Sequence, residues 1–210
     1  KMVRKESFWS ERLNEQVINP ALSIHDDGLL EGGMASGSRD AEGVPRRHQN
    51  LVKNGRLTNM LWSTRDAAQQ VAEGRTDAAS STGSANSGGH QSPPSTGCTE
   101  LFLTTNEATS SWDQLLEQMG EGYVVNSVMG AHTANPTSGD FSVTTSAILK
   151  VVDGEVVGAL KQAGLSGNLA KAMNGKVVLG DEVRRQGSYS SGSMHLPDVL
   201  LLDGLRINPA

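Results

Sequence analysis

The sequence has few aromatic residues, one cysteine and no long apolar run. Aromatic residues make up 4% of the 210 residues and apolar residues 36%, whereas glycine occurs 24 times. That profile is typical of a turn-rich β or α+β protein rather than a helical bundle. The single cysteine, Cys98, excludes an internal disulfide and a zinc site built from cysteines alone. Because an unpaired thiol is easiest to keep in a reducing compartment, we expect a cytoplasmic protein.

Signals for a membrane or for nucleic acid are also missing. No apolar run approaches the ~20 residues that cross a bilayer, and residues 1–17 lack the apolar stretch of a signal peptide. A helical pattern follows Lys1 so closely that we expect the natural chain to extend further upstream. The net charge of −5 argues against nucleic acid as a partner, since nucleic-acid-binding proteins normally present a basic face.

Apolar spacing predicts four short helices. Trp9, Leu13 and Val17 recur at helical spacing and predict a first helix that ends before Pro20. In "SSWDQLLEQMG", Ser111 and Gln114 have the pattern of a capping box, and apolar residues one turn apart line one face. Two further helices are predicted at "TRDAAQQVA" and "GNLAKAMNG".

Glycine-containing turns separate several extended runs. The pairs Asn54-Gly55, Asp153-Gly154 and Asp203-Gly204 predict sharp turns between strands. Residues 75–97 are rich in Ser, Gly, Thr and Pro, which predicts a long polar loop that is mobile unless another part of the chain covers it. Together these patterns predict an α+β fold dominated by strands, with an antiparallel or mixed sheet, barrel-like or sandwich-like, and a few short covering helices.

The patterns of most chemical sites are absent. The histidines do not have the close spacing of two metal ligands on one helix, so five separate surface or turn histidines are the simpler interpretation: His25, His48, His90, His132 and His195. A site assembled from distant histidines stays open. Neither a nucleophile elbow nor a phosphate-binding glycine motif occurs. Turn formation is enough to explain Asp26, Asp27 and Asp153.

The stretch "MGAHTANPTSGDFSVTTS", residues 129–146, gathers a histidine, an amide, a carboxylate and several hydroxyls. Asp140 stands out because it enters a strand rather than preceding a turn glycine. A structural role in holding the loop is the stronger interpretation of this carboxylate. The residues alone therefore predict a β-rich domain without a self-contained active site.

The ordered segments nevertheless resemble a known family. The series "LNEQV", "DAEGVP", "LVKNGRL", "GAHTANPTSGDFSVTTSAILKVVDGEV", "AGLSGNLAKAM" and "SSGSMHLPDVLLLDGLRI" resembles the C-terminal half of the TldD/PmbA family, in the same order along nearly the whole chain. The most specific parts are "SGDFS", the "DGEVVG" turn and the "GNL" that follows. The resemblance implies that residues 1–210 are the family's C-terminal domain and that its N-terminal domain is absent from this chain.

The family, first named as modulators of DNA gyrase, implies a two-protein metallopeptidase. A TldD-like subunit carries HExxxH, whose histidines bind zinc and whose glutamate activates water, and a cysteine near its C-terminus completes the metal site. A PmbA-like subunit, also called TldE, lacks the motif and pairs with it. Together they cut unfolded or extended peptides, which the cleft receives as an added β-strand.

This sequence departs from the catalytic pattern at two places. HExxxH does not occur in the 210 residues, and Ser191 stands where the catalytic subunit's cysteine is expected. Serine is a poor zinc ligand beside a thiolate, because sulfur is the softer and more acidic donor. We therefore expect a non-catalytic, PmbA/TldE-like subunit without a cofactor of its own, with zinc in a TldD-like partner. By the same resemblance, His132, Asn135, Ser138, Asp140 and Phe141 are candidates for the peptide cleft or the subunit contact, and none is assigned a catalytic role.

Three alternatives remain at this stage. The partner could be a TldD-like subunit or a second copy of this chain. The chain could be a fragment of an active metallopeptidase whose HExxxH lies upstream of Lys1, so whether it belongs to an enzyme depends on that sequence. It could also be a regulator of gyrase, which the acidic balance argues against.

Overall fold

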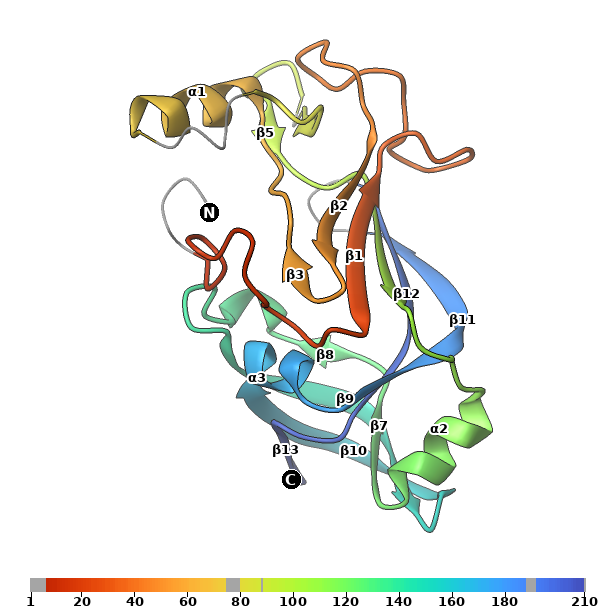
Figure 1. Ribbon diagram of the computed structural model, residues 1–210. Coiled ribbons are helices and arrows are strands. Elements are labelled where there is room, and N and C mark those ends of the chain that lie inside the picture. Colours follow the sequence, from red (N-terminus) through yellow and green to blue (C-terminus); the bar gives the residue numbers. More distant parts are fainter. Residues whose placement is uncertain (1–6, 75–79, 88, 188–191, 210) are drawn as a thin grey trace.

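The computed structural model describes residues 7–74, 80–87, 89–187 and 192–209 and contains two main β-sheets (Figure 1). The first has the strand order β11-β12-β6-β1-β2-β3. Its neighbours are antiparallel except β12 and β6, which are parallel. The strands are β1 (Leu22–Asp27), β2 (His48–Lys53), β3 (Arg56–Leu57), β6 (Glu100–Thr105), β11 (Val177–Gly187) and β12 (Ser193–Leu201).

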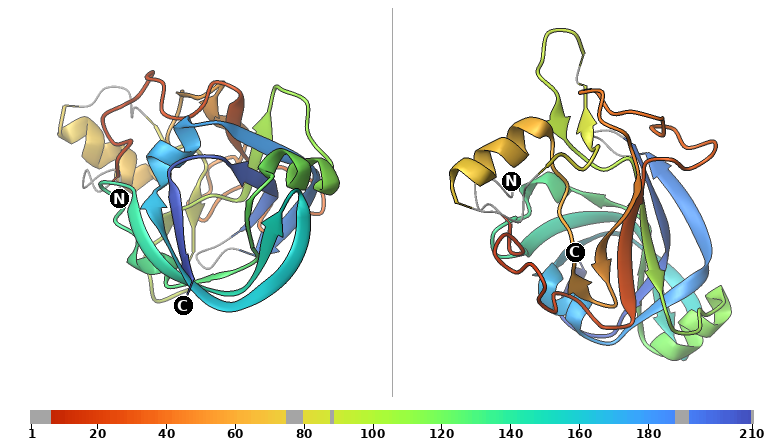
Figure 2. Two further views of the ribbon diagram at one scale, coloured as in Figure 1. Left: turned by 90° about the horizontal axis from the view of Figure 1, so that it is seen from below. Right: turned by 45° about the horizontal axis from the view of Figure 1, so that its top comes forward.

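The second sheet has the order β13-β10-β9-β7, and β8 also pairs with β9. Its strands are β7 (Gly122–Val125), β8 (Val128–Met129), β9 (Asp140–Val152), β10 (Glu155–Asn168) and β13 (Leu205–Pro209). Seen from below, the long strands β9 and β10 curl around the interior (Figure 2, left). A small third sheet joins β4 (Ala85–Asn86) to β5 (Ser95–Thr96). The strand-dominated α+β class with mixed sheets is therefore confirmed.

The helices are short and lie beside the sheets. They are α1 (Thr64–Ala72), α2 (Trp112–Met119), α3 (Leu169–Asn174) and the 3-10 turn η2 (Ala131–Thr133). The capping box of α2 is confirmed, because the Ser111 hydroxyl accepts from the Gln114 amide at 3.4 Å and the Gln114 side chain accepts from the Ser111 amide at 2.9 Å. None of the helices in the described residues is long and apolar enough to cross a bilayer.

The predicted first helix is wrong. Residues 7–20 form successive turns, and Asn14 has a left-handed φ of 66°. The amides of Asn14 and Val17 donate to the carbonyls of Leu57 (2.7 Å) and Gly55 (2.8 Å), so the β2–β3 hairpin uses donors that a helix would need. Val17 still lies in the hydrophobic core, with Trp9 and Leu13 packed against it. The apolar spacing thus identified the buried side of this segment but not its backbone.

The turn predictions hold. Asn54 and Gly55 have φ of 48° and 73°, and Asp153 and Gly154 have 51° and 76°, as two-residue hairpin turns require. These turns connect β2 to β3 and β9 to β10. The third turn, at Asp203-Gly204, carries the chain from β12 in the first sheet to β13 in the second.

The polar stretch 75–97 is covered in part: residues 81–86 are buried, whereas residue 87 and residues 89–93 are exposed. Ser84 is fully buried and its hydroxyl accepts from the Gln49 side chain at 3.0 Å. The Ala85 amide donates to Asp40 at 3.0 Å, and Arg46 donates to the Asn86 side chain at 3.1 Å. Residues 81–86 belong to an internal hydrogen-bond network, so low hydrophobicity alone did not predict exposure for this part of the stretch. The exposure predicted for a polar loop is confirmed at residues 89–93.

Candidate functional site

Four rings form a row across the first sheet, which we call the ring row: His48, His25, Phe102 and His195. They come from the neighbouring strands β2, β1, β6 and β12. The centroid separations along the row are 4.9, 4.8 and 4.1 Å, and both neighbours of Phe102 stack nearly parallel to it. Strand register explains the stacking, since Phe102 is opposite His25 on one side and His195 on the other.

The interpretation of five separate histidines is therefore wrong for three of them. Phe102 and His195 come from distant segments, and only the parallel pairing of β6 with β12 brings their rings together. A sequence signal was present, because both rings lie in strand-like runs. Nothing local predicts which strands become neighbours or in what register.

A carboxylate lies at each end of the ring row. Glu100 is fully buried and contacts His195, with 2.8 Å between Oε2 and Nε2. The Ala35 amide donates to the other Glu100 oxygen at 2.9 Å. Burial by itself would raise the pKa of Glu100, but the hydrogen bonds from Ala35, His195 and Ser193 and the charge interaction with His195 together outweigh it, so the pKa lies below its ordinary value. At the other end, Asp27 lies 3.6 Å from Nδ1 of His48.

The middle of the row disfavours positive charge. Burial lowers the pKa of His25, and the neighbouring His48 and His195 lower it further, against an opposing effect of Asp27. A neutral imidazole stacked on Phe102 is therefore the stable form near neutral pH.

The start of β6 is fixed by a buried carboxylate. Asp26 is 1% exposed and accepts hydrogen bonds from the amides of Thr99 (2.6 Å) and Glu100 (3.0 Å). Burial raises the pKa of Asp26, although these amides act in the opposite direction. Turn formation therefore does not explain Asp26, although it does explain Asp27, which accepts from the Leu29 amide at 3.0 Å.

The backbone after position 191 packs against this same segment. Gly192 has φ of 81°, and a Cβ there would lie 2.0 Å from the Thr99 carbonyl. The Ser193 amide donates to that carbonyl at 2.9 Å. Ser191 itself lies outside the described residues. Burial raises the pKa of the nearby Cys98 thiol, as expected of a packed rather than a reactive cysteine.

The sequence-predicted site residues lie elsewhere, at the start of β9 in the second sheet. His132, Asn135, Ser138 and Asp140 are exposed, and Phe141 is half-buried. The Asn135 side chain accepts from the Thr137 amide at 2.9 Å, and Asp140 accepts from the Asn168 side chain at 2.8 Å. Hydrogen bonds from Asn168 and Ser138 lower the pKa of Asp140. The contacts within this loop hold its shape, and its role at a cleft or interface stays a prediction.

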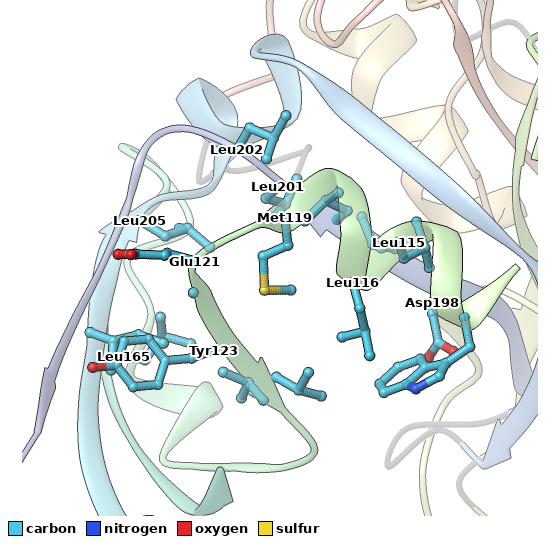
Figure 3. A pocket seen from close by; sticks show the side chains of 17 residues that line it. Leu115, Leu116, Met119, Glu121, Tyr123, Leu165, Asp198, Leu201, Leu202 and Leu205 are labelled. Atoms are coloured by element: carbon cyan, nitrogen blue, oxygen red, sulfur yellow. The ribbon is translucent and has the colours of Figure 1, made fainter. Parts of the chain in front are cut away.

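A cavity of about 500 Å³ lies between α2 and strands β7, β10, β12 and β13 (Figure 3). Leu115, Leu116 and Met119 of α2 point into it, opposite Leu165 of β10. Its labelled acidic side chains are Glu121 and Asp198. The lining is suited to apolar contact and not to proton transfer or metal binding.

Metal ligands do not gather in the described residues. No group of three His, Cys, Asp or Glu side chains among them could hold a metal ion. A catalytic zinc requires three protein ligands and an open position. The described residues therefore do not fit the zinc that the family resemblance implies.

Comparison with known proteins identifies the family. The profile of the PmbA/TldA metallopeptidase C-terminal domain matches residues 1–208. An uncharacterized protein of Methanocaldococcus jannaschii is 30% identical over 191 residues, which cover 91% of this chain and 42% of that protein. Metalloprotease PmbA of Escherichia coli O157:H7 is 28% identical over 196 residues, which cover 93% of this chain and 39% of that protein. This chain belongs to the TldD/PmbA family and corresponds to its C-terminal domain.

The fold comparison agrees. The crystal structure of TldE from Thermococcus kodakarensis superposes with a TM-score of 0.81 at 21% identity, covering 99% of this chain and 44% of that one. At that identity the likeness shows the fold alone. The chain spans about two fifths of the length of the curated relatives it matches, at 42% and 39%.

Proposed function

We propose that this chain is the C-terminal domain of a PmbA/TldE-type, non-catalytic subunit of a zinc-dependent, peptide-cleaving complex. The observation that carries the proposal is the donor set. Among the described residues no three candidate ligands lie together, and Ser191 occupies the sequence position at which the resemblance predicts a cysteine ligand. Catalytic zinc would belong to a TldD-like partner that carries HExxxH.

The contribution of this chain would be to bind and position an extended peptide. Sheet edges are suited to this task, because an added strand gains backbone hydrogen bonds with little dependence on sequence. The edge strand β11 is exposed throughout residues 182–187. Its neighbour β12 carries His195 of the ring row, so a strand bound there would lie close to the ring row.

Reconstitution tests the proposal. The full chain, a TldD-like partner and their mixture are compared for cleavage of an unfolded peptide, with and without a zinc chelator. We expect zinc-dependent cleavage that requires the partner, and no cleavage when the glutamate of the partner's HExxxH is replaced by glutamine. Robust zinc-dependent cleavage by residues 1–210 alone would contradict the proposal.

A second candidate is an active metallopeptidase with its motif upstream. It is favoured by the relatives named metalloproteases, of which this chain covers about two fifths. The gene sequence before Lys1 decides between the two: HExxxH in the same reading frame favours the active enzyme. Light scattering of the purified full chain then distinguishes a homodimer from a chain that needs a different partner.

A further inference from the structure

The two edge strands of the first sheet differ: other backbone segments pair with β3, whereas part of β11 has no such partner among the described residues. At the β3 edge, the Leu57 amide donates to the Glu15 carbonyl at 2.9 Å, and the backbones of Gln16 and Arg56 form an antiparallel β-bridge. At the β11 end, Ser110 bonds to Leu179 and Asp181, each at 3.0 Å. Beyond Asp181, no backbone hydrogen bond from another described segment reaches the outer edge of residues 182–187. This edge therefore offers unpaired backbone groups to a further strand.

The open edge carries two arginines in different states. Arg184 lies 3.2 Å from Asp198 and 4.0 Å from Glu182, so its charge is already compensated. Arg185 has no carboxylate within 4.0 Å in the described part of the chain. Among the described residues, its guanidinium donates only to the Gly32 carbonyl, at 3.4 Å. Arg185 therefore presents an uncompensated positive charge beside the open edge.

Strand register fixes the face on which this charge lies. Arg185 is directly opposite His195, so both side chains project to the face that carries the ring row. A strand added outside β11 would place one side chain opposite Arg185 on that face. Two positions away on either side, its side chains would face Val183, which is 57% exposed, and Gly187, which has no side chain.

We propose that β11 selects extended peptides with an aspartate or glutamate opposite Arg185 and an apolar residue two positions away, opposite Val183. The inference rests on the proposed function, since it specifies which peptides that edge would accept. An arginine binds a carboxylate through two parallel, charge-assisted hydrogen bonds. A glutamine in the peptide has no negative charge and cannot form the same pair. The pairing across an edge also weakens with salt, because the pair stays exposed to solvent.

Peptide binding to the full chain, measured by fluorescence anisotropy, tests the proposal. The probes are seven-residue peptides that differ only at the central position, which is Glu, Gln or Lys. We expect the Glu peptide to bind about two- to fivefold more tightly than the Gln peptide at low salt, the range of a cross-strand charge pair. In R185Q this difference should vanish, and in R185E the Lys peptide should bind best.

Two controls test whether the preference depends on Arg185 and whether the peptide binds as an added strand. R184Q removes the neighbouring charge on the other face and should leave the preference intact. N-methylation of alternate peptide amides should abolish binding for one set of amides and spare the other, because only one set faces β11. Equal binding of Glu and Gln peptides to the wild type, or a preference that survives R185Q, would overturn the proposal.

The remaining outcomes separate this inference from the proposed function. If all peptides bind equally and N-methylation still discriminates, strand addition stands and the acidic preference is wrong. If no peptide binds while the reconstituted complex still cleaves, the β11 assignment is wrong and the subunit role survives. A second copy of this chain could occupy the same edge; a dimer by light scattering that acidic peptide does not dissociate would also overturn the proposal.

Discussion

At the scale of single residues, the adjacent aspartates Asp26 and Asp27 have different structural roles. Asp27 caps a turn, as its position before a glycine predicts, whereas Asp26 is buried and holds the start of β6. Alternation along β1 places the two side chains on opposite faces of the sheet. The sequence alone could not assign them, because it does not say which face the rest of the chain covers. The candidate residues of 129–146 lie in the loop before β9 and at the first two positions of that strand, and their proposed role remains a prediction.

Substitution of Asp26 tests this residue-scale account. Asn keeps an oxygen that can accept from the Thr99 and Glu100 amides, and it removes a charge that burial disfavours. We expect Asp26→Asn to keep the free energy of unfolding at pH 7 within about 1 kcal/mol, and Asp26→Ala to lower it by about 2–3 kcal/mol, since Ala leaves both amides unpaired. Urea denaturation measures both. Equal losses for Asn and Ala would contradict the role of the two hydrogen bonds.

At the scale of elements, local signals were reliable and distant pairings were not. The Asn54-Gly55 turn and the capping box of α2 depend on residues within a few positions of each other, and both were predicted correctly. The helix expected before Pro20 failed because its amides bond to the β2–β3 hairpin. The ring row was missed because it also depends on a pairing between distant segments, the register of β6 against β12.

The hairpin turns provide a test of how closely these elements pack. Gly55 and Gly154 have similar positive φ, of 73° and 76°, so alanine costs about 1–2 kcal/mol at either from backbone conformation. A Cβ at Gly55 would also lie 2.4 Å from the Ile18 carbonyl, whereas at Gly154 the nearest atom is 3.1 Å away. We expect Gly55→Ala to lower the melting temperature clearly more than Gly154→Ala. Similar decreases in melting temperature in calorimetry would show that the N-terminal segment can move away from a Cβ at position 55 at little cost in free energy.

At the scale of the whole molecule, we expect titration of the ring row, which spans four strands of the first sheet, to make the free energy of unfolding depend on pH. The pKa of His25 is lower in the folded protein than in the unfolded chain, whose ordinary value is 6.5. Between these two pKa values the unfolded chain binds more protons, so the free energy of unfolding rises with pH and is lost as pH falls through this window. Glu100, with its lowered pKa, loses its contribution only at more acidic pH, as pH falls through its folded pKa.

The expected result is a decrease in the free energy of unfolding between pH 7.5 and 5.5, measured by urea denaturation at each pH. His25→Phe should flatten this dependence, because it keeps a ring stacked on Phe102 and removes the titrating group. His132→Gln, at an exposed position, is the matched control and should leave the slope unchanged. Asp26 acts in the opposite direction above its ordinary pKa of 3.8, so the series is repeated with Asp26→Asn to separate the two groups. An unaltered slope in His25→Phe would show that the ring row does not couple the stability of the sheet to pH.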